Sequence, residues 1–416
     1  MTRARAGLIR PPLLPALFPV IAPAVLAALL GASPARADDP PASDAASATA
    51  QPPACAWPAW QAFQSRLLQQ DGRVVDPASP RAHTVSEAQA YAMFFALVAG
   101  DRAVFERILR WTEDNLAAGD LALRLPSWQW GRRDDGSWGV LDANSAADAD
   151  LWLAYVLAQA GRRWDERRYH ALSSLLAERI LREETAVVPG LGRVLLPGAQ
   201  GFEPADGLWR LNPSYVPPFL LRWFSTHSGD PRWDAVHRSG LRLLQESAPH
   251  GFAPDWAYFR QSAADGKPAA FELSERIAPD RAGAYDAIRV YLWVGITSPA
   301  DPERAALLQH FSAMTAAAAR GAPPRRVDAA TGSGDGSLGP PGFSAALLPI
   351  SAALGQDAAL HSLLNRLRSE PPASDAYYEQ ALALFGMGSL EGRYAFAGDG
   401  SLIFAAAPCS AEPAHP

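Results

Sequence analysis

A regular alternation between two kinds of predicted helix limits the fold of this chain more than any other feature of its sequence. Hydrophobic positions recur with a helical period through most of the chain and predict about twelve helices. The predicted helices span residues 57–70, 86–99, 103–117, 145–160, 165–183, 213–228, 231–247, 285–296, 302–319, 342–354, 357–367 and 374–387. Every second helix begins with small, acidic or aromatic residues and is then strongly apolar, whereas the helices between them carry charged side chains along one face.

This alternation predicts two concentric rings of helices. A helix that is apolar all round is buried, and a helix with one charged face lies at the surface. We therefore expect an all-α fold, an (α/α)6 barrel of six helical hairpins, whose inner helices begin at one rim. The alternative for these helix starts is that Ser, Asp, Asn and Pro act only as caps and first-turn residues. Residues 187–196 and 394–404 are each expected to form a minor β-hairpin.

The N-terminus has the pattern of a secretory signal peptide. Three arginines within the first ten residues precede an apolar stretch over 13–30, and Ala35-Arg36-Ala37 offers a cleavage site of small residues. We expect a signal peptide at 1–37, a flexible leader at 38–54, and one catalytic domain over 55–416. Prolines interrupt the apolar stretch, and no later stretch is long enough to span a bilayer. The sequence therefore predicts a monomer that is exported to the periplasm or secreted, with no permanent membrane span.

Composition and motifs exclude several other classes. The net charge of −6 and the absence of basic clusters with interleaved aromatics argue against a nucleic-acid partner. No HExxH motif, spaced Cys/His set or phosphate-binding glycine loop with its lysine occurs, so no metal or cofactor is expected. Cys55 and Cys409 are expected to pair in an oxidising compartment, and two free thiols are the alternative.

Two carboxylates at predicted helix starts are the first candidates for chemistry. Glu87 follows Ser86 at the start of one apolar helix, and Asp286 begins another far along the chain. Two such groups facing one cleft suit acid/base cleavage of a glycosidic bond. The alternative for Glu87 is a capping box, because Thr84-x-x-Glu87 has that spacing and the glutamate would then bind only backbone donors.

Tryptophans in turn-like surroundings supply the second part of a saccharide site. The chain has 13 tryptophans, and Trp128, Trp130, Trp138, Trp209 and Trp256 lie among polar or turn residues. Sugar rings stack their CH faces on aromatic side chains beside polar groups. The alternative for each of these tryptophans is that it covers the core.

Five segments then resemble glycoside hydrolase family 8. They are Ser-Glu-Ala-Gln at 86–89, Asp-Ala-Asp-Leu-Trp at 148–152, Asn-Pro-Ser-Tyr at 212–215, Tyr-Asp-Ala-Ile-Arg at 285–289 and Gly-Phe-Ser-Ala-Ala at 342–346. They keep the order of the family across nearly all of the chain after the signal peptide. Within the family, the chain is most similar to the periplasmic endoglucanases that accompany bacterial cellulose synthases. This resemblance implies the same (α/α)6 barrel and an inverting endo-β-1,4-glucanase acting on cellulose beside a cellulose synthase complex.

The resemblance also implies the roles of individual residues. Glu87 would be the general acid and Asp286 the general base, about 6.5–9.5 Å apart as inversion requires. Asp148 would bind and distort the sugar at the cleavage point, and Tyr215 would lie beside the attacking water. The expected substrate-binding residues are Trp128, Trp130, Trp209, Tyr285, Arg289 and Asp150. Two departures from the family pattern are Ala88 and Ala149, which stand where the family commonly has glycine.

The electrostatic expectation is that burial and nearby acids keep Glu87 protonated near neutral pH, while Asp286 stays ionised. Three rival functions remain open at this point. They are another family 8 specificity (xylan, chitosan or mixed-linkage glucan), a polysaccharide lyase on the same barrel, and a non-catalytic glucan-binding component of an export machine.

Overall fold

A computed structural model of the protein describes residues 57–262, 268–319 and 321–405. The expected signal peptide, the leader and both cysteines, Cys55 and Cys409, lie outside the described residues, so those expectations stay predictions. Within the described ranges, no helix combines the length and the apolar character needed to cross a membrane.

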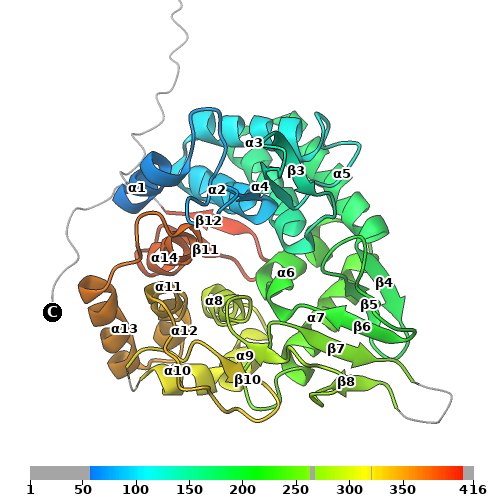
Figure 1. The fold of residues 1–416 in the computed structure, drawn as a ribbon, viewed down its shortest axis with the longest axis vertical. Coiled ribbons are helices and arrows are strands. Elements are labelled where there is room, and N and C mark those ends of the chain that lie inside the picture. The colour runs from blue at the N-terminus through cyan, green and yellow to red at the C-terminus, as the bar shows by residue number, and fades with distance from the viewer. Residues whose placement is uncertain (1–56, 263–267, 320, 406–416) are drawn as a thin grey trace, which may run out of the picture. The chain divides into compact units, whose positions relative to one another are not determined.

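The apolar helices form an inner ring in which each contacts the next (Figure 1). These helices are α2 (Ser86–Ala99), α4 (Ala147–Trp164), α6 (Pro218–His227), α8 (Ile288–Ile296), the pair α11 (Pro341–Ala346) and α12 (Leu348–Ala353), and α14 (Tyr377–Leu390). The ring closes where α14 contacts α2. Residues on every side of α2, α4 and α8 are buried, as their apolar sequences predict.

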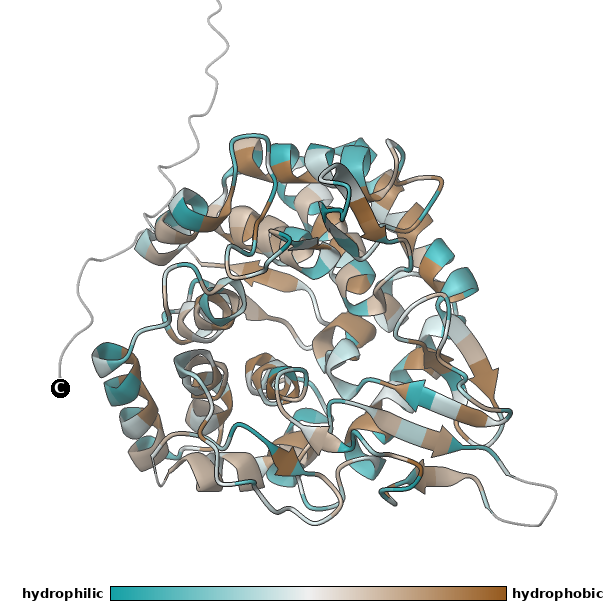
Figure 2. Ribbon diagram, viewed as in Figure 1, coloured by the Kyte–Doolittle hydropathy of each residue, from teal (hydrophilic) through white to brown (hydrophobic). Residues whose placement is uncertain are grey.

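The remaining helices, most of which carry charged side chains, form an outer layer around this ring. They are α1 (Pro58–Leu67), α3 (Arg102–Leu116), α5 (Arg167–Glu183), α7 (Arg232–Glu246), α9 (Arg304–His310), α10 (Ser312–Ala318) and α13 (Asp357–Ser369). Helices α3, α5, α7 and α9 pack on α2, α4, α6 and α8, while α13 packs on α11 and α12, and α1 on α14. Figure 2 shows hydrophilic bands on several of these outer helices, among them α1 and α13. The predicted (α/α)6 barrel is confirmed.

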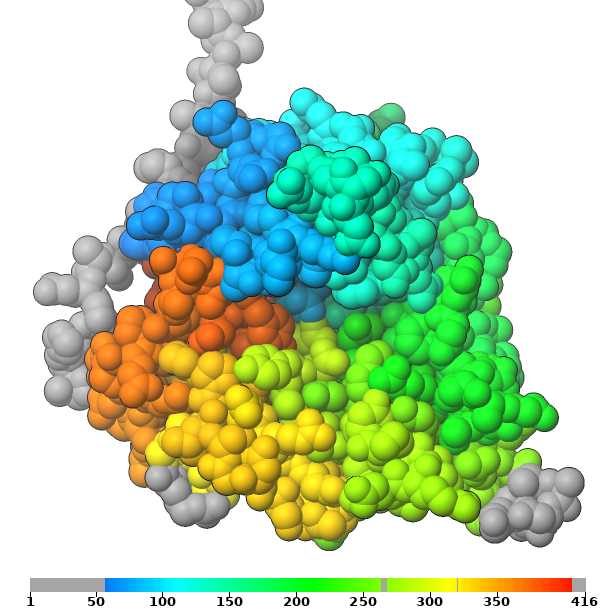
Figure 3. Space-filling model, in the orientation of Figure 1, coloured from blue at the N-terminus to red at the C-terminus, as the bar shows by residue number. Residues whose placement is uncertain are grey.

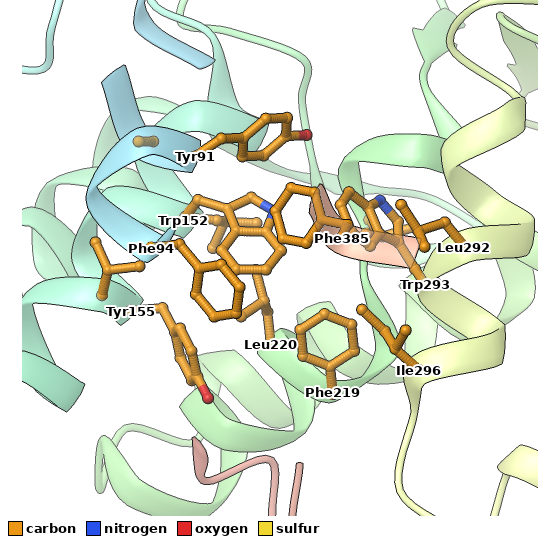
Figure 4. Packing of buried hydrophobic residues seen from close by; sticks show 14 of the residues in the cluster. Tyr91, Phe94, Trp152, Tyr155, Phe219, Leu220, Leu292, Trp293, Ile296 and Phe385 are labelled. Atoms are coloured by element: carbon orange, nitrogen blue, oxygen red, sulfur yellow. The ribbon is translucent and has the colours of Figure 1, made fainter. Parts of the chain in front are cut away.

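Aromatic side chains fill the inside of the ring (Figure 4). The Trp152 ring of α4 lies 5.3 Å from the Phe385 ring of α14 and 5.4 Å from the Trp293 ring of α8. The Phe219 ring of α6 lies 5.8 Å from Trp152. All four side chains are buried. Large rings in edge-on or tilted contact remove much apolar surface from water, so this cluster fixes the spacing of four inner helices.

Some predicted helices are divided or begin later than expected. The predicted helix 342–354 is split into α11 and α12, because Pro349 has no N–H to continue the helical hydrogen bonds. The segment 213–228 starts with a 3-10 turn, η1 (Pro213–Tyr215), before α6. Helix α8 begins at Ile288, so Tyr285 and Asp286 lie in the preceding turn. The predicted helix 302–319 is two helices, α9 and α10.

Short antiparallel strands lie in the segments between and after the barrel helices. The two predicted hairpins are confirmed as β4 (Thr185–Val188) with β5 (Gly192–Leu195), and β11 (Tyr394–Phe396) with β12 (Leu402–Phe404). The unpredicted strands are β1 (Thr84–Val85), β2 (Gln129–Arg132), β3 (Trp138–Asp142), β6 (Leu208–Leu211), β7 (Ala257–Arg260), β8 (Ala270–Glu272), β9 (Ala282–Gly283) and β10 (Val327–Asp328). They pair as β1–β2–β3, β6–β7–β8 and β9–β10. Because β1 runs directly into α2, the first sheet fixes where that inner helix starts.

Candidate active site

The buried guanidinium of Arg289 joins three carboxylates that lie far apart in the sequence. Arg289 is in the first turn of α8, and its exposed fraction is only 2%. Its Nη2 donates to Asp286 Oδ1 at 2.8 Å. Its Nη1 donates to Asp148 Oδ2 at 3.1 Å and also to Glu87 Oε2. Three of the predicted site residues, Glu87, Asp148 and Asp286, therefore meet at one site formed by the starts of α2, α4 and α8.

Glu87 faces this site and does not cap its helix. The N-cap position of α2 is Val85, and it makes no side-chain cap hydrogen bond. The hydroxyl of Thr84 donates instead to a backbone carbonyl of the preceding loop at 2.6 Å. Glu87 Oε1 accepts a hydrogen bond from the Tyr377 hydroxyl at 3.1 Å, and Oε2 accepts from Arg289. The capping-box alternative is excluded by these contacts.

Asp286 is held in the turn before α8 by two polar side chains. Asn212 Nδ2 donates to Asp286 Oδ2 at 3.1 Å. Asp255 Oδ1 accepts from the Asp286 N–H at 3.0 Å and from two other backbone N–H groups of the same segment at 2.8 Å each. Burial, together with the charges of Asp255 and Asp148, raises the pKa of Asp286 to about 7. The carboxylate is thus fixed in place and titrates near neutral pH.

Asp148 lies in the first turn of α4 and is buried. Burial raises the pKa of its carboxyl group to about 7. One guanidinium offsets one negative charge, and further anions in a buried site are costly. A cluster of three carboxyl groups and one arginine therefore holds at least one proton near neutral pH, and that proton is shared by the group as a whole.

Tyr215, which ends the turn η1, lies beside the guanidinium of Arg289. The Arg289 Cζ atom is 5.6 Å from the centre of the Tyr215 ring. Ser214 Oγ accepts from Arg289 Nη2 at 3.0 Å, and its carbonyl accepts from Trp293 Nε1 at 3.0 Å. The Asn212 side chain accepts from the Ser214 N–H at 3.0 Å. These bonds place Tyr215 next to Arg289, which also binds Asp286.

Other predicted substrate-binding residues offer aromatic surface. Tyr285 directly precedes Asp286, is 48% exposed, and has its ring 5.2 Å from that of Phe343. Trp209 is half-buried on β6. Trp128 is half-buried, and its carbonyl accepts the Ser86 N–H at 2.9 Å, which ties this segment to the start of α2. A partly exposed aromatic ring beside polar groups suits the CH face of a sugar.

Three of the expected substrate-binding residues make other contacts: Arg289 binds the three carboxylates, and Trp130 and Asp150 are held elsewhere. The Trp130 ring stacks on Trp138 at 5.4 Å in a groove on the outer side of the barrel. Asp150 is fully buried and has no exposed surface to offer a sugar. Burial and the neighbouring Glu184 raise its pKa well above the ordinary value. Glu184 is also fully buried, its pKa is raised to about 8, and its Oε1 accepts from Ser145 Oγ at 2.5 Å.

Several residues that build the site were not predicted as site residues. Asn212 and Ser214 belong to the motif 212–215, and Tyr377 begins the last inner helix, so the pattern of helix starts contained a signal for them. Asp255 lies in a loop without periodicity, and nothing in the sequence marked it. Among the residues that the structure describes, no three His, Cys, Asp or Glu side chains are grouped to hold a metal ion.

The surface is hollowed near the middle of the inner ring. Figure 3 shows this hollow between the blue and cyan segments on one side and the yellow and green segments on the other. Helices α2 and α4 belong to the first set of colours and α8 to the second. The three carboxylates come from these helix starts, which agrees with an open cleft across the rim.

Comparisons with known proteins agree with this arrangement. The family model of glycosyl hydrolases family 8 matches residues 41–392. The chain is 46% identical over 351 residues to the endoglucanase of Escherichia coli (strain K12), covering 84% of this chain and 91% of that protein. It is 45% identical over 363 residues to the endoglucanase of Xanthomonas axonopodis pv. citri (strain 306), covering 86% and 92%. The crystal structure of the endo-1,4-D-glucanase from Vibrio fischeri ES114 matches with a TM-score of 0.78 at 41% identity, covering 84% of this chain and 99% of that one. The chain belongs to glycosyl hydrolases family 8, and it is a glycoside hydrolase.

Proposed function

We propose that the protein is an endo-β-1,4-glucanase that hydrolyses internal bonds of cellulose with inversion at the anomeric carbon. The observation that carries this proposal is the meeting of Glu87, Asp148 and Asp286 around one buried arginine at the rim of the barrel. The choice of substrate is supported by two relatives named endoglucanases. The match to this chain covers 91% of one relative and 92% of the other.

Glu87 is the general acid, which gives its proton to the glycosidic oxygen as the bond breaks. Its contact with Arg289 favours the ionised carboxylate. The cluster nevertheless has more carboxyl groups than cations, so a proton is available within it. A bound sugar displaces water from the site, so the free-energy cost of keeping two or three of the carboxyl groups ionised rises. This favours a protonated Glu87 in the complex.

Asp286 is the general base, which takes a proton from the water that attacks the opposite face of the sugar. Asn212 and Asp255 fix its direction, and the raised pKa suits a group that must accept a proton near neutral pH. Tyr215 lies beside the path of this water. Asp148 accepts hydrogen bonds from the sugar at the cleavage point and favours its distorted ring.

The wider cleft binds the glucan chain through stacking. Tyr285, Trp209 and Trp128 present half-buried or exposed rings on the elements that surround the carboxylates. A polymer held at several rings is cut internally, because the chain extends beyond the cleavage point in both directions. The signal-like N-terminus supports export to the periplasm, where the enzyme would act on glucan made by a cellulose synthase complex.

A panel of polysaccharides tests the activity. Release of reducing ends from cellulose and carboxymethyl-cellulose, with little from xylan or chitosan, is the expected result. Faster hydrolysis of xylan, chitosan or mixed-linkage glucan would show that cellulose is not the preferred substrate. Binding of cello-oligosaccharides without new reducing ends would refute catalysis.

Two variants test the assigned roles. Glu87→Gln and Asp286→Asn are each expected to fold normally and to lose nearly all turnover of carboxymethyl-cellulose. Glu178→Gln is the matched control, since Glu178 lies on the outer helix α5 in an exposed ion pair. NMR of the first products should show α-anomers from the β-linked substrate, and early β-anomers would contradict inversion.

A further inference from the structure

A second groove with aromatic walls lies on the outer side of the barrel. Its volume is about 810 Å³, and it is bounded by the turn 69–73, by α3 and by the β2–β3 hairpin. None of Glu87, Asp148 or Asp286 lines it. A volume of this size is within the range of roughly 300–1,000 Å³ that is usual for ligand sites.

Trp130 and Trp138 form a platform in this groove, which the buried Trp111 supports. The Trp130 and Trp138 rings are stacked, with centres 5.4 Å apart and planes at 18°. Trp111 meets Trp130 edge-on at 5.3 Å. Trp138 is 49% exposed. An exposed indole of this size costs free energy in water unless something covers it, and the CH face of a pyranose ring is a suitable cover.

Buried contacts hold the platform in position. The guanidinium of Arg73 lies 4.4 Å from the Trp130 ring centre and 4.8 Å from that of Trp138. Arg73 is itself buried, and its Nε donates to Thr84 Oγ1 at 2.8 Å. Gly72 has a φ of +102°, and a Cβ there would lie 2.2 Å from the Arg107 carbonyl oxygen, so the turn rests directly on α3. A platform fixed in this way binds a ligand without first having to be ordered.

The polar groups around the platform suit a neutral sugar polymer. Arg107, Arg110 and Asp114 are exposed on one face of α3, on the same side as Trp111. Asp71 and Asn115 also line the groove. The charges have both signs, so the groove favours neither a polyanion nor a polycation, and it offers both donors and acceptors to hydroxyl groups.

We infer that this groove is a second binding site for a β-linked glucan, separate from the catalytic cleft. The two sites are close in space although separated in the sequence, because Trp130 pairs with Thr84 in the sheet that leads into α2 and Glu87. A glucan held on the platform is therefore kept near the cleft after each cut. The choice of glucan as ligand rests on the proposed function.

Titration calorimetry with cellohexaose tests the inference in the Glu87→Gln background, where hydrolysis is absent. Two binding events per chain are expected, and adding Trp138→Ala should remove one of them or weaken it by about tenfold or more, as truncation of a tryptophan anchor commonly does. Trp138→Phe should restore part of the binding. Leu123→Ala is the control, because Leu123 is 65% exposed and does not line the groove.

The outcomes separate this inference from the proposed function. A single binding event in Glu87→Gln, or two events that Trp138→Ala leaves unchanged, overturns the second site even if the wild-type protein cuts cellulose. Two events, of which Trp138→Ala removes one, support the site even if no polysaccharide is cleaved. A change of oligomeric state in Trp138→Ala, measured by light scattering, without a change in cellohexaose binding would show that a second copy of the chain covers the platform, and would overturn the inference.

Discussion

Replacing Arg289 by methionine removes the only cation in contact with Glu87, Asp148 and Asp286 among the residues that the structure describes. The shape of the side chain is roughly kept, but its charge and its hydrogen bonds are lost. Arg289→Lys is the matched variant, because it keeps the charge and loses only the forked geometry that reaches several acids at once. The pair of variants separates the electrostatic contribution from the geometric one.

The expected size of the effect follows from the contacts. Unit charges about 4 Å apart interact by about 4 kcal/mol in an effective dielectric of about 20. That energy corresponds to about 3 pKa units at about 1.4 kcal/mol each. It agrees with the loss of about 3–5 kcal/mol that usually follows removal of one partner from a buried ion pair. The carboxyl groups of Asp148 and Asp286, whose pKa values are already about 7, would therefore titrate well above neutrality.

The sign of the pH dependence distinguishes this reasoning from simple loss of packing. Both aspartates have a folded-state pKa above the ordinary value of 3.8. The folded state then binds more protons than the unfolded state, so its stability falls as the pH rises from about 4 through the folded pKa. Without Arg289 the folded pKa is higher still, and this fall extends further. The methionine variant should lose about 3–5 kcal/mol of unfolding free energy at pH 8 and clearly less at pH 5.

Urea denaturation at the two pH values, for the wild-type protein and both variants, measures this difference. The lysine variant should follow the pH dependence of the wild type more closely than the methionine variant does. Equal losses at pH 5 and pH 8 in the methionine variant would refute the electrostatic account, as would a loss below about 1 kcal/mol at pH 8.

Three further predictions concern residues around the site and the second groove. Asp255→Asn removes a charge that raises the pKa of Asp286, so the acid limb of the pH–rate profile should move below about 7, and an unmoved limb would contradict the coupling. Burial holds the pKa of Glu184 at about 8, above its ordinary 4.5, so the native state loses stability as the pH rises through that window. Glu184→Gln should therefore gain thermal stability relative to the wild type between pH 5 and pH 9, whereas parallel curves would show that Glu184 does not titrate in this way. Gly72→Ala should destabilise the fold more than Gly119→Ala, because both have positive φ but only the Cβ at position 72 meets backbone atoms; equal melting temperatures would disprove the close approach.

The sequence was sufficient to predict the rings of helices, because burial on all sides and burial on one side leave different patterns. Residues 86–99 are strongly apolar after their first turn and lie in the inner ring, while 103–117 carry charges on one face and lie outside. Breaks inside helices were harder to place. Pro349 divides a predicted helix, yet the apolar pattern continues across it.

The site was predictable where its residues begin inner helices, and not elsewhere. Glu87 and Asp286 were found because they stand at predicted helix starts, and Asp148 was identified through the resemblance to the family. Asp255 supports Asp286 from a loop, and no local pattern marks a side chain whose partners are backbone groups about 30 positions away. Asp150 was grouped with the site by the resemblance to the family, in which it belongs to the same acidic segment as Asp148. Successive residues of a helix point in different directions, and Asp150 is fully buried with no surface exposed to the cleft.

Two kinds of contact hold the inner ring together, and they respond differently to pH. Trp152, Phe385 and Trp293 join the helices through apolar burial, which does not depend on protonation. Arg289 joins the same ring at the rim through carboxyl groups that titrate near neutrality. Acid therefore protonates the rim while the aromatic cluster stays intact. It follows that activity lost just below neutral pH reflects protonation of the base in a folded protein, and it should return at once when the pH is restored.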